Sequence, residues 1–504
     1  MIRMMIAAPA SGSGKTAVTC GMLALLKRMN RRVCAFKCGP DYIDPMLHRS
    51  VLGVESHNLD LFLSDEAGVK EQYARYSAHH DAVICEGVMG YYDGVGGTTV
   101  QASPWHLADV LGMPVIIVMK PKGASLTLAA QIKGLCSLRQ PHHIAGIILN
   151  QCTDMLFRSV APVIERESGV PVLGYLPYME EAAFQSRHLG LYTAGEIDRL
   201  AQRLDRIAEE LEAGLDMERL MAVCGGEEAG GLCSIYEEDK AVPTADNILP
   251  DGTAGKVSIA VARDEAFCFA YPETIDVLCR MGAKIEYFSP LHDDALPEGA
   301  KGVYLPGGYP ELYAGELSEN RAMRESVYRA VKGGIPTVAE CGGFLYLGRE
   351  LEGSDGRIYP MAGALPGSAE KKQRLVRFGY AEVTARKDSM LFRTGERIPV
   401  HEFHYWDSSD NGDALHAVKP VSGREWDFGF ASETMYAGFP HLYFAGRDIL
   451  ARRFVEAAAS YGNGLTKEPD AAASEDFPKA AVDIGDKPAE RATVADGKSG
   501  GMSR

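Results

Sequence analysis

Two short segments of the chain carry residue types that do chemistry. Near the start, a loop of small residues leads into Lys15 and Thr16, the pattern of a phosphate-binding loop that opens a helix. Much further along, Cys341 follows an apolar run and precedes two glycines. A nucleotide-binding lysine and a nucleophilic cysteine in one chain predict that ATP activates a group and that the cysteine releases ammonia from glutamine. We therefore expect an ATP-dependent amidating enzyme.

The loop before Lys15 is suited to an anion. A strand, a small-residue loop and a helix place the backbone N–H groups of Gly12 and Gly14, and a helix N-terminus, around a phosphate. We expect Lys15 to reach the β- and γ-phosphates of ATP and Thr16 to bind Mg²⁺. Pro9 stands where the usual pattern has its first glycine, but the residues between it and Gly14 are all small. The context favours nucleotide binding over a simple glycine-rich turn.

Acidic residues follow the next two apolar runs. Lys37, Asp41 and Asp44 come at or after the end of one run, and Glu86 and Asp93 come at or after the end of the other. Because the carboxyl ends of parallel strands open onto one crevice, we expect these side chains to face the phosphate loop, with Lys37 beside the nucleotide. Each acid alone could equally build a turn. Since Mg²⁺ is commonly held by one or two carboxylates plus phosphates, the predicted metal ligands are Thr16, Asp44 and Glu86.

Cys341 is expected on a sharp turn between a strand and a helix. The apolar run Ile335–Ala339 predicts the strand, and the run from Phe344 predicts the helix, so that 340–343 forms the turn. A thiol at a helix N-terminus is exposed and favours the reactive thiolate, and the flanking glycines permit the turn. The other ten cysteines are better interpreted as structural thiols.

A cysteine nucleophile needs a base, and three histidines compete for that role. His441 follows a strand-like segment, whereas His401 and His404 lie together in a second aromatic-rich string, and spacing alone does not separate them. Upstream, Gly307 and Gly308 form a turn whose N–H groups could stabilise an oxyanion.

Composition limits the class of protein. The 504 residues exceed the usual span of one core, so two domains are expected. Hydrophobic residues at 46% indicate a globular chain, and a formal charge of −16 argues against a nucleic-acid partner. No signal peptide or membrane-length apolar stretch is apparent. The eleven cysteines lack a repeated spacing, which favours reduced thiols, so a cytoplasmic protein without a membrane partner is expected.

The elements that must position these residues are short apolar strands separated by helices. Near-continuous apolar runs of this kind predict parallel sheets covered on both faces, hence an α/β fold in each half. A long amphipathic helix is expected over 194–220. The predicted strands are Met4–Ala8, Val33–Lys37, Ala82–Glu86, Pro114–Met119, Ala145–Asn150, Val172–Leu176, Val257–Ala262, Ile285–Phe288, Gly302–Leu305 and Ile335–Ala339.

The predicted boundaries follow from changes in composition. Residues 1–225 form the nucleotide-binding domain and residues 256–456 the domain with the cysteine. Residues 226–255 are rich in Gly and Glu without periodicity, which predicts a linker. Residues 463–504 have few large apolar groups, so we expect a disordered tail.

Several strings together resemble one family. Over about residues 4 to 456, the chain resembles the cobyrinic acid a,c-diamide synthase family, whose members join an ATP-dependent synthetase domain to a class I glutamine amidotransferase domain. The strings that carry this resemblance are Lys37–Pro45, Arg187–Leu191, Ala260–Phe269, Gly307–Tyr313 and His401–Tyr405.

The resemblance implies a fold and a reaction. It implies a P-loop domain resembling dethiobiotin synthetase, in which the γ-phosphoryl group of ATP is transferred to a substrate carboxylate, and ammonia from glutamine then displaces phosphate. It places the synthetase acids on Asp41, Asp44, Glu86 and Asp93, with Tyr42 beside them at the substrate.

The resemblance also selects the glutaminase pair. It implies Cys341 as nucleophile and His441 as its base, which decides among the three histidines. Ordinary class I amidotransferases carry a Glu two residues after that histidine, but this chain has Tyr443 there. The third member of the triad is therefore not assigned.

Some alternatives remain at this stage. The implied co-substrates are ATP and L-glutamine with Mg²⁺, and the implied substrate is a tetrapyrrole polycarboxylate: cobyrinic acid, or alternatively hydrogenobyrinic acid or a nickel sirohydrochlorin. Amidation of other positions, as in a cobyric acid synthase, fits the Lys37–Pro45 string less well. A different class is a partitioning-type ATPase switch with an inactive amidotransferase domain. A homodimer is left open.

Overall fold

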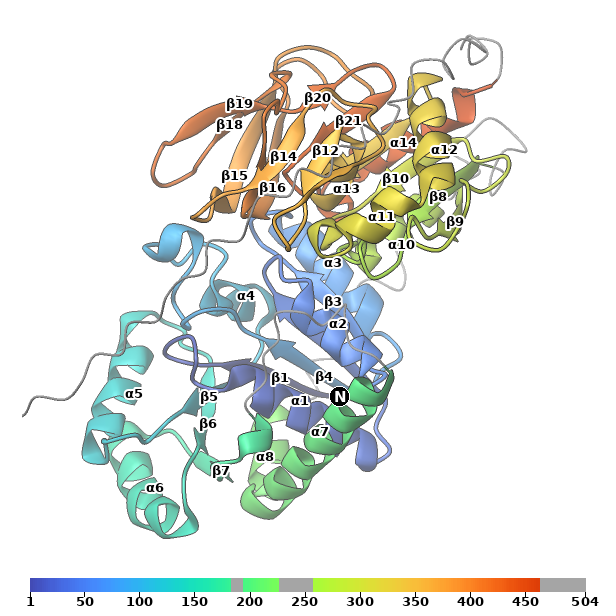
Figure 1. Cartoon of the computed structure of the whole chain (residues 1–504). Helices are drawn as coiled ribbons and strands as arrows, with labels where there is room; N and C mark the ends of the chain where they lie inside the picture. The colour runs from blue at the N-terminus through green and yellow to red at the C-terminus, as the bar shows by residue number, and fades with distance from the viewer. Residues whose placement is uncertain (183–193, 226–256, 463–504) are drawn as a thin grey trace, which may run out of the picture.

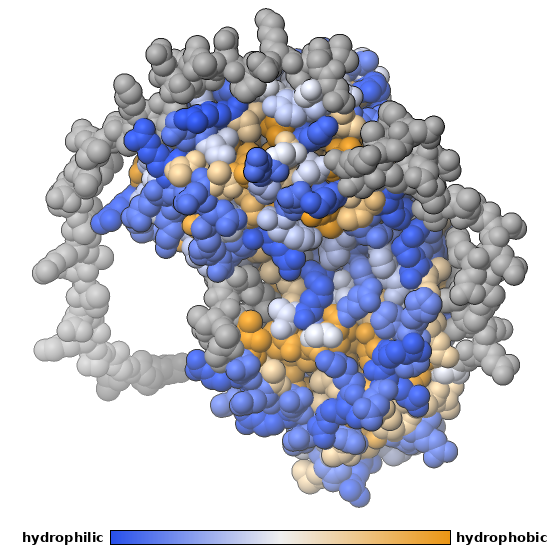
Figure 2. All heavy atoms as spheres, turned by 90° about the vertical axis from the view of Figure 1, so that its right-hand side faces the viewer, coloured by the Kyte–Doolittle hydropathy of each residue, from blue (hydrophilic) through white to orange (hydrophobic). Residues whose placement is uncertain are grey.

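The computed structural model describes residues 1–182, 194–225 and 257–462, which form two α/β bodies in contact (Figure 1). The expected linker 226–255, the expected tail 463–504 and the string Arg187–Leu191 lie outside the described residues. Hydrophilic residues cover most of the face in Figure 2, with apolar patches between them. No helix within the described ranges is long and apolar enough to cross a membrane.

The first body is a seven-stranded sheet in the order β3-β2-β4-β1-β5-β6-β7. All its pairings are parallel, and its strands are almost wholly buried, as expected for a sheet covered on both faces. The strands are β1 (Ile2–Ala7), β2 (Val33–Cys38), β3 (Glu55–Leu59), β4 (Ala82–Glu86), β5 (Val115–Met119), β6 (Ile144–Asn150) and β7 (Val172–Leu176).

Helices cover both faces of this sheet. One apolar core packs α1, α2, α7 and α8 against it, and a second core packs α3, α4, α5 and α6 against the other face. The helices are α1 (Lys15–Arg28), α2 (Ile43–Ser50), α3 (Glu66–Ser77), α4 (Pro104–Leu111), α5 (Leu126–Leu138), α6 (Asp154–Ser168), α7 (Ala194–Gly214) and α8 (Met217–Cys224), with short 3-10 turns η1 (Val95–Gly97) and η2 (Glu180–Ala182).

Two expectations for the first body are corrected. Strand β3 was not predicted, because Ser56, His57 and Asn58 are polar, yet all three side chains are buried and hydrogen-bonded. The single helix expected over 194–220 is two helices. The first of them, α7, ends at Gly214. Asp216 caps the second, α8, by accepting a hydrogen bond from Arg219 N at 3.0 Å.

The second body is built on a six-stranded sheet in the order β20-β21-β11-β10-β8-β9. Every pairing is parallel except β20 with β21. Its strands are β8 (Val257–Ala262), β9 (Ala283–Phe288), β10 (Gly302–Leu305), β11 (Thr337–Glu340), β20 (Phe430–Ala431) and β21 (Met435–Gly438), and its helices are α10 (Pro272–Arg280), α11 (Ala314–Glu319), α12 (Arg321–Lys332), α13 (Gly342–Leu347) and α14 (Asp448–Ser460), with 3-10 turns η5 (Pro310–Leu312) and η6 (Phe444–Gly446).

Two four-stranded sheets are inserted between α13 and β20, and neither was predicted. Some of their strands are short, as β12 is, and the longer β15 and β16 alternate in burial, which gives a weaker sequence signal than a fully buried parallel strand. One contains β12 (Glu350–Glu352), β13 (Ile358–Pro360), β14 (Ser368–Lys371) and β17 (Trp406–Ser408); the other contains β15 (Arg377–Ala385), β16 (Arg397–His404), β18 (Leu415–Val418) and β19 (Glu425–Phe428).

The two bodies meet through buried polar contacts and through a small apolar cluster that contains side chains from both bodies. Glu273 of α10 is fully buried, and its Oε1 lies 2.9 Å from His57 Nδ1 and accepts a hydrogen bond from Asn58 N at 2.8 Å. Tyr380 of β15 donates to Asp60 Oδ2 at 2.7 Å. These contacts place the carboxyl ends of β2 and β3 against the second body (Figure 1). The predicted α/β architecture of both halves, with a parallel sheet in the first, is confirmed.

Candidate functional site

The phosphate loop is held tightly at its glycine. Gly14 caps α1 with φ 97°, and a Cβ there would lie 1.9 Å from Asn150 Nδ2. Asn150 Nδ2 donates to Ser13 O at 2.9 Å, so the loop is tied to the end of β6. Lys15 Nζ donates to Met89 O at 2.6 Å and therefore links the loop to the segment after β4. This strand–loop–helix arrangement presents N–H groups to an anion.

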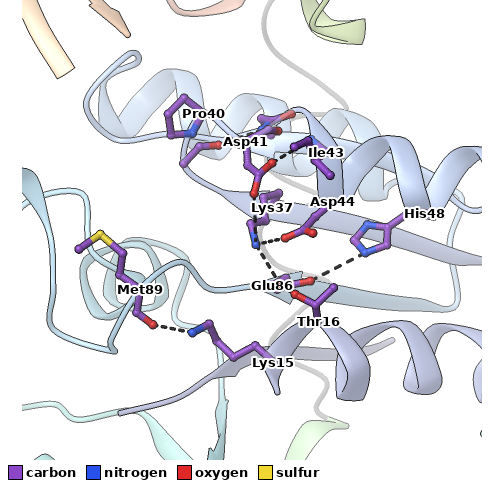
Figure 3. Close-up of polar contacts among 12 residues, drawn as sticks. Lys15, Thr16, Lys37, Pro40, Asp41, Ile43, Asp44, His48, Glu86 and Met89 are labelled. Atoms are coloured by element: carbon purple, nitrogen blue, oxygen red, sulfur yellow. Dashed lines mark hydrogen bonds and ion pairs between the residues drawn. The ribbon is translucent and has the colours of Figure 1, made fainter. Parts of the chain in front are cut away.

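Beside that loop, Lys37 is surrounded by carboxylates (Figure 3). Its Nζ forms an ion pair with Asp44, lies 3.0 Å from Glu86 Oε1 and lies 3.8 Å from Asp41 Oδ2. Thr16 Oγ1 donates to the same Glu86 Oε1 at 2.7 Å. The structure therefore brings together five of the predicted residues from α1, β2, the loop before α2, α2 itself and β4.

Burial and mutual repulsion shift the acids of this cluster. Burial, followed by the neighbouring Asp44, raises the pKa of Asp41 to about 6 and that of Glu86 to about 7, although Lys37 opposes both shifts. Burial would also raise the pKa of Asp44, but its contact with Lys37 outweighs burial and lowers it. Burial and the nearby Lys37 lower the pKa of Lys15 to about 8.

One oxygen of Glu86 is placed as a ligand of a divalent cation would be, because it is buried and has no hydrogen-bond partner among the described residues. That oxygen is Oε2, while the other oxygen of Glu86 accepts from Thr16. His48 Nε2 lies 3.9 Å from Oε2, but burial lowers the pKa of His48 to about 4, so the imidazole is neutral. A buried carboxylate oxygen without a partner is costly unless a cation approaches it.

Asp93 lies apart from this cluster. Its Oδ2 accepts a hydrogen bond from Gly90 N at 3.0 Å and so closes its own loop. It still acts electrostatically on Lys15, whose pKa it raises slightly against the larger effect of burial. Asp93 thus lies on the side of Lys15 and the phosphate loop rather than next to Lys37.

Cys341 occupies the sharp turn between β11 and α13. Its backbone has φ 47° and ψ −101°, a conformation that L-residues rarely adopt and that is common at nucleophiles. The strand runs to Glu340 and the helix begins at Gly342, so the turn is shorter than the expected 340–343. A Cβ on Gly343 would lie 2.1 Å from Leu305 O, so no side chain fits there.

Among the three histidines, His441 is the one whose pKa the Cys341 thiol raises. Burial lowers the pKa of His441, but Cys341 and Glu340 beside it outweigh burial and raise it to about 10. His401 pairs with His441 only through the backbone, His441 N donating to His401 O at 2.9 Å, and burial lowers the pKa of its imidazole to about 3. His404 stacks on Phe439 with ring centroids 3.7 Å apart.

Glu340 is a site residue that sequence reasoning missed. It is fully buried, and its Oε2 lies 3.7 Å from His441 Nδ1. Tyr304 donates to Oε2 at 3.0 Å, and Leu442 N donates to Oε1 at 3.0 Å, which fixes the carboxylate. The available signal was an acid directly before the nucleophile at the end of a buried strand.

Tyr443 points elsewhere. Its hydroxyl donates to Gln72 Oε1 of α3 at 2.5 Å and lies 3.2 Å from Asn58 O, so it joins the contact between the two bodies. The predicted oxyanion turn lies close to the pair: a Cβ on Gly307 would lie 2.5 Å from His441 Cε1, and a Cβ on Gly342 would lie 3.0 Å from Gly308 N.

Tyr42 lies between the two clusters. Its ring centroid is 5.2 Å from that of His441 and 4.3 Å from that of Tyr271. Along the chain it separates Asp41 from the start of α2, which carries Asp44. One aromatic side chain therefore lies against His441 of the second body and belongs to the acidic loop of the first.

Two known domain families match this chain. Residues 4–190 match the CobQ/CobB/MinD/ParA nucleotide binding domain, and residues 258–449 match the CobB/CobQ-like glutamine amidotransferase domain. The cobyrinate a,c-diamide synthase of Salmonella typhimurium is 38% identical over 90% of this chain and 97% of its own length. Those of Caldanaerobacter subterraneus and Clostridium acetobutylicum are each 36% identical, over 91% and 88% of this chain and 98% of their own lengths.

The two matched domains define a glutamine-dependent, ATP-using amide ligase, as the sequence predicted. The chain belongs to the cobyrinate a,c-diamide synthase family. Among solved structures, a putative GMP synthase component from Thermoplasma acidophilum aligns with a TM-score of 0.30 at 20% identity, covering 40% of this chain and 94% of that one.

Proposed function

We propose that this enzyme amidates the a and c side-chain carboxylates of cobyrinic acid in cobalamin biosynthesis, with ATP and glutamine as co-substrates. The observation that carries the proposal is the position of Tyr42, whose ring lies 5.2 Å from that of His441 while its neighbours Asp41 and Asp44 face Lys37. The nitrogen-releasing site and the acid-rich site are therefore adjacent. The names of the relatives supply the substrate.

In the synthetase half, the proposed chemistry is activation of a carboxylate. A carboxylate is a poor acyl donor, and transfer of the γ-phosphoryl group of ATP to it gives an acyl phosphate with a good leaving group. Gly12, Gly14 and Lys15 are assigned to the phosphates of ATP, and Lys37 to the transferred group. Asp41, Asp44 and Asp93 position the reactants, and Tyr42 contacts the substrate.

Thr16, Asp44 and Glu86 are the residues that would hold Mg²⁺. When bound, the ion would neutralise charge on the phosphate oxygens during transfer. The support is the pair of Glu86 oxygens, one bonded to Thr16 and the other buried without a hydrogen-bond partner in the part of the chain that the structure describes. Lys37 already neutralises part of the acidic charge of this cluster.

In the amidotransferase half, Cys341 is assigned as the nucleophile that attacks the glutamine amide. The raised pKa of His441 keeps the imidazole protonated near neutral pH, so it can support the thiolate and give a proton to the departing ammonia. The N–H groups of Gly307 and Gly308 are assigned to the oxyanion. Glu340 holds His441 through Nδ1, the role that a third triad member has elsewhere.

The reaction is tested by mass spectrometry of the tetrapyrrole. Cobyrinic acid incubated with enzyme, ATP, Mg²⁺ and glutamine should gain two amides in place of two carboxyls. Hydrogenobyrinic acid and nickel sirohydrochlorin run in parallel, because they carry equivalent side chains. Product from one of these alone would change the substrate while keeping the chemistry. ATP hydrolysis without any amidation would favour the partitioning-type switch, against which family membership already argues.

A further inference from the structure

Three large aromatic side chains stand exposed on one side of the β15–β16 hairpin. Phe378 is 59% exposed, Phe403 49% and Tyr405 42%. Their rings meet edge to face, with centroids 5.7 Å apart for Phe378 and Phe403 and 5.8 Å apart for Phe403 and Tyr405. A contiguous exposed aromatic surface is uncommon unless it binds something. We call these three residues the aromatic platform.

A basic segment borders the aromatic platform. In a chain of net charge −16, residues 371–377 contain two lysines and two arginines and no acid. The segment is fixed to the platform by the backbone: Lys372 N donates to Tyr405 O at 2.9 Å. Arg374 is exposed and forms no ion pair with another described residue. Lys419 also lies beside the platform, because its Nζ donates to Phe378 O at 2.7 Å.

The platform continues into the site already described. Phe378 and Tyr380 lie on the same side of β15, and both rings contact His401, with centroids 6.2 Å and 5.8 Å away. Tyr380 Oη lies 3.6 Å from the place of a Cβ on Gly39, at the start of the acidic loop. The strand that carries the platform therefore leads directly to the loop that carries Asp41.

The sheet that contains β15 and β16 also reaches the loop that follows Asp93. Val421, in the turn between β18 and β19, would be 2.7 Å from a Cβ on Gly96, three residues after Asp93. The sheet that carries the platform thus touches both loops that bring acids to the synthetase site. Its open aromatic side is continuous with that interface.

We propose that the aromatic platform and the basic segment 371–377 bind the macrocycle of the tetrapyrrole substrate, so the amidotransferase half holds the compound that the synthetase half activates. The inference rests on the proposed function. A tetrapyrrole offers a broad apolar face and a rim of carboxylates, which complement aromatic rings bordered by cations. Carboxylates at one edge then point toward Asp41 and Asp44, and those at the other edge meet Arg374.

The test compares tetrapyrrole affinity in the full-length enzyme. A Phe378→Ser, Phe403→Ser double variant should raise the KM for cobyrinic acid about tenfold or more with saturating ammonium and ATP, because two stacking faces are lost. Binding of cobyrinic acid without ATP, followed by its visible absorbance, should weaken in parallel. Arg374→Ala should raise the same KM, and added salt should shrink the difference from wild type.

Matched variants separate this site from a general surface effect. Tyr287 on β9 is 49% exposed, as Phe403 is, and Arg357 has an exposed side chain. Tyr287→Ser and Arg357→Ala should keep the wild-type KM. The KM for ATP in each variant reports on the phosphate loop and serves as a folding check.

Two results would overturn the proposal while leaving the proposed function intact. The first is that the wild-type enzyme amidates cobyrinic acid and that the double variant has the same KM and the same absorbance titration. The other is a double variant whose only change is a lower oligomeric state in sedimentation, which would make the platform a contact between copies of this chain. If the wild-type enzyme neither binds nor amidates any of the three tetrapyrroles, the proposed function itself fails.

Discussion

Glu340 Oε2 lies 3.7 Å from His441 Nδ1, and both residues are buried beside Cys341. In this chain the acid that faces the histidine precedes the nucleophile directly in sequence, instead of following the histidine by two residues. Hydrogen bonds from Tyr304 and from Leu442 N fix its carboxylate. The proposed glutaminase centre is therefore assembled from the end of one strand and the segment after another.

Glu340→Gln should slow glutamine hydrolysis about tenfold or more, because the imidazole loses its anionic partner. Since Glu340 contributes to raising the pKa of His441 to about 10, the variant should lower that pKa. The alkaline limb of the pH–rate profile for glutamine hydrolysis should then move to lower pH. Glu340→Asp should recover part of both effects.

The matched control is Glu402→Gln, a carboxylate that is equally buried on β16 and whose Oε2 lies 3.8 Å from His404 instead. That variant should leave the alkaline limb in place. An unmoved limb in Glu340→Gln would remove Glu340 as the positioning acid.

Tyr443→Phe changes the residue that stands where ordinary class I amidotransferases carry a Glu. Removing the hydroxyl leaves Gln72 Oε1 buried without its donor, at a cost of about 1–3 kcal/mol in the free energy of unfolding. Denaturant unfolding should show this loss, while glutamine hydrolysis stays close to the wild-type rate. If hydrolysis instead falls as far as in Glu340→Gln, Tyr443 belongs to the catalytic group.

Lys15→Ala should abolish amidation from both glutamine and ammonium, because either route needs the phosphorylated carboxylate. Lys133→Ala, at an exposed lysine of the same half, should retain both activities. Product measured by mass spectrometry from ammonium in the Lys15 variant would contradict the phosphate-loop assignment.

Asp44→Asn should reduce ammonium-dependent turnover by about a hundredfold, since it removes a charge proposed to position Mg²⁺ and the transferred group. The comparison is Asp109→Asn, an acid of α4 that lies 2.8 Å from His143 Nε2. Titration with Mg²⁺ is the informative measurement: a wild-type Mg²⁺ requirement and turnover in the Asp44 variant would make Asp44 a structural partner of Lys37 only.

Much of the first body was predictable because its strands are buried on both faces. Runs such as Val172–Leu176 have the predicted bounds, and the acids at the ends of β2 and β4 meet as the topology requires. Strand β3 was not predictable, since Asn58 and His57 are buried by partners from distant segments, among them Glu273 of the other body. No local pattern encodes those partners.

The proposed glutaminase centre was likewise predictable only in part. Cys341 and the glycines after it form a local signature, so the elbow is visible in the sequence. The orientation of the Glu340 carboxylate depends on hydrogen bonds from Tyr304 and Leu442. Both partners lie far from Glu340 along the chain. The choice of His441 over His401 likewise depends on tertiary packing, which the resemblance supplied and spacing did not.

In the proposed mechanism, one site releases ammonia and another activates the carboxylate. Cys341→Ser keeps the elbow but replaces a thiol, which can ionise to a nucleophilic thiolate, with a hydroxyl that stays protonated. The decisive measurement is the rate of tetrapyrrole amidation by this variant with glutamine and, separately, with high ammonium. Cys279→Ser, at an exposed cysteine, serves as the control with both nitrogen sources intact. We predict no product from glutamine and near-wild-type product from ammonium, with unchanged dependence on ATP and Mg²⁺. Amidation from glutamine at the wild-type rate would contradict the claim.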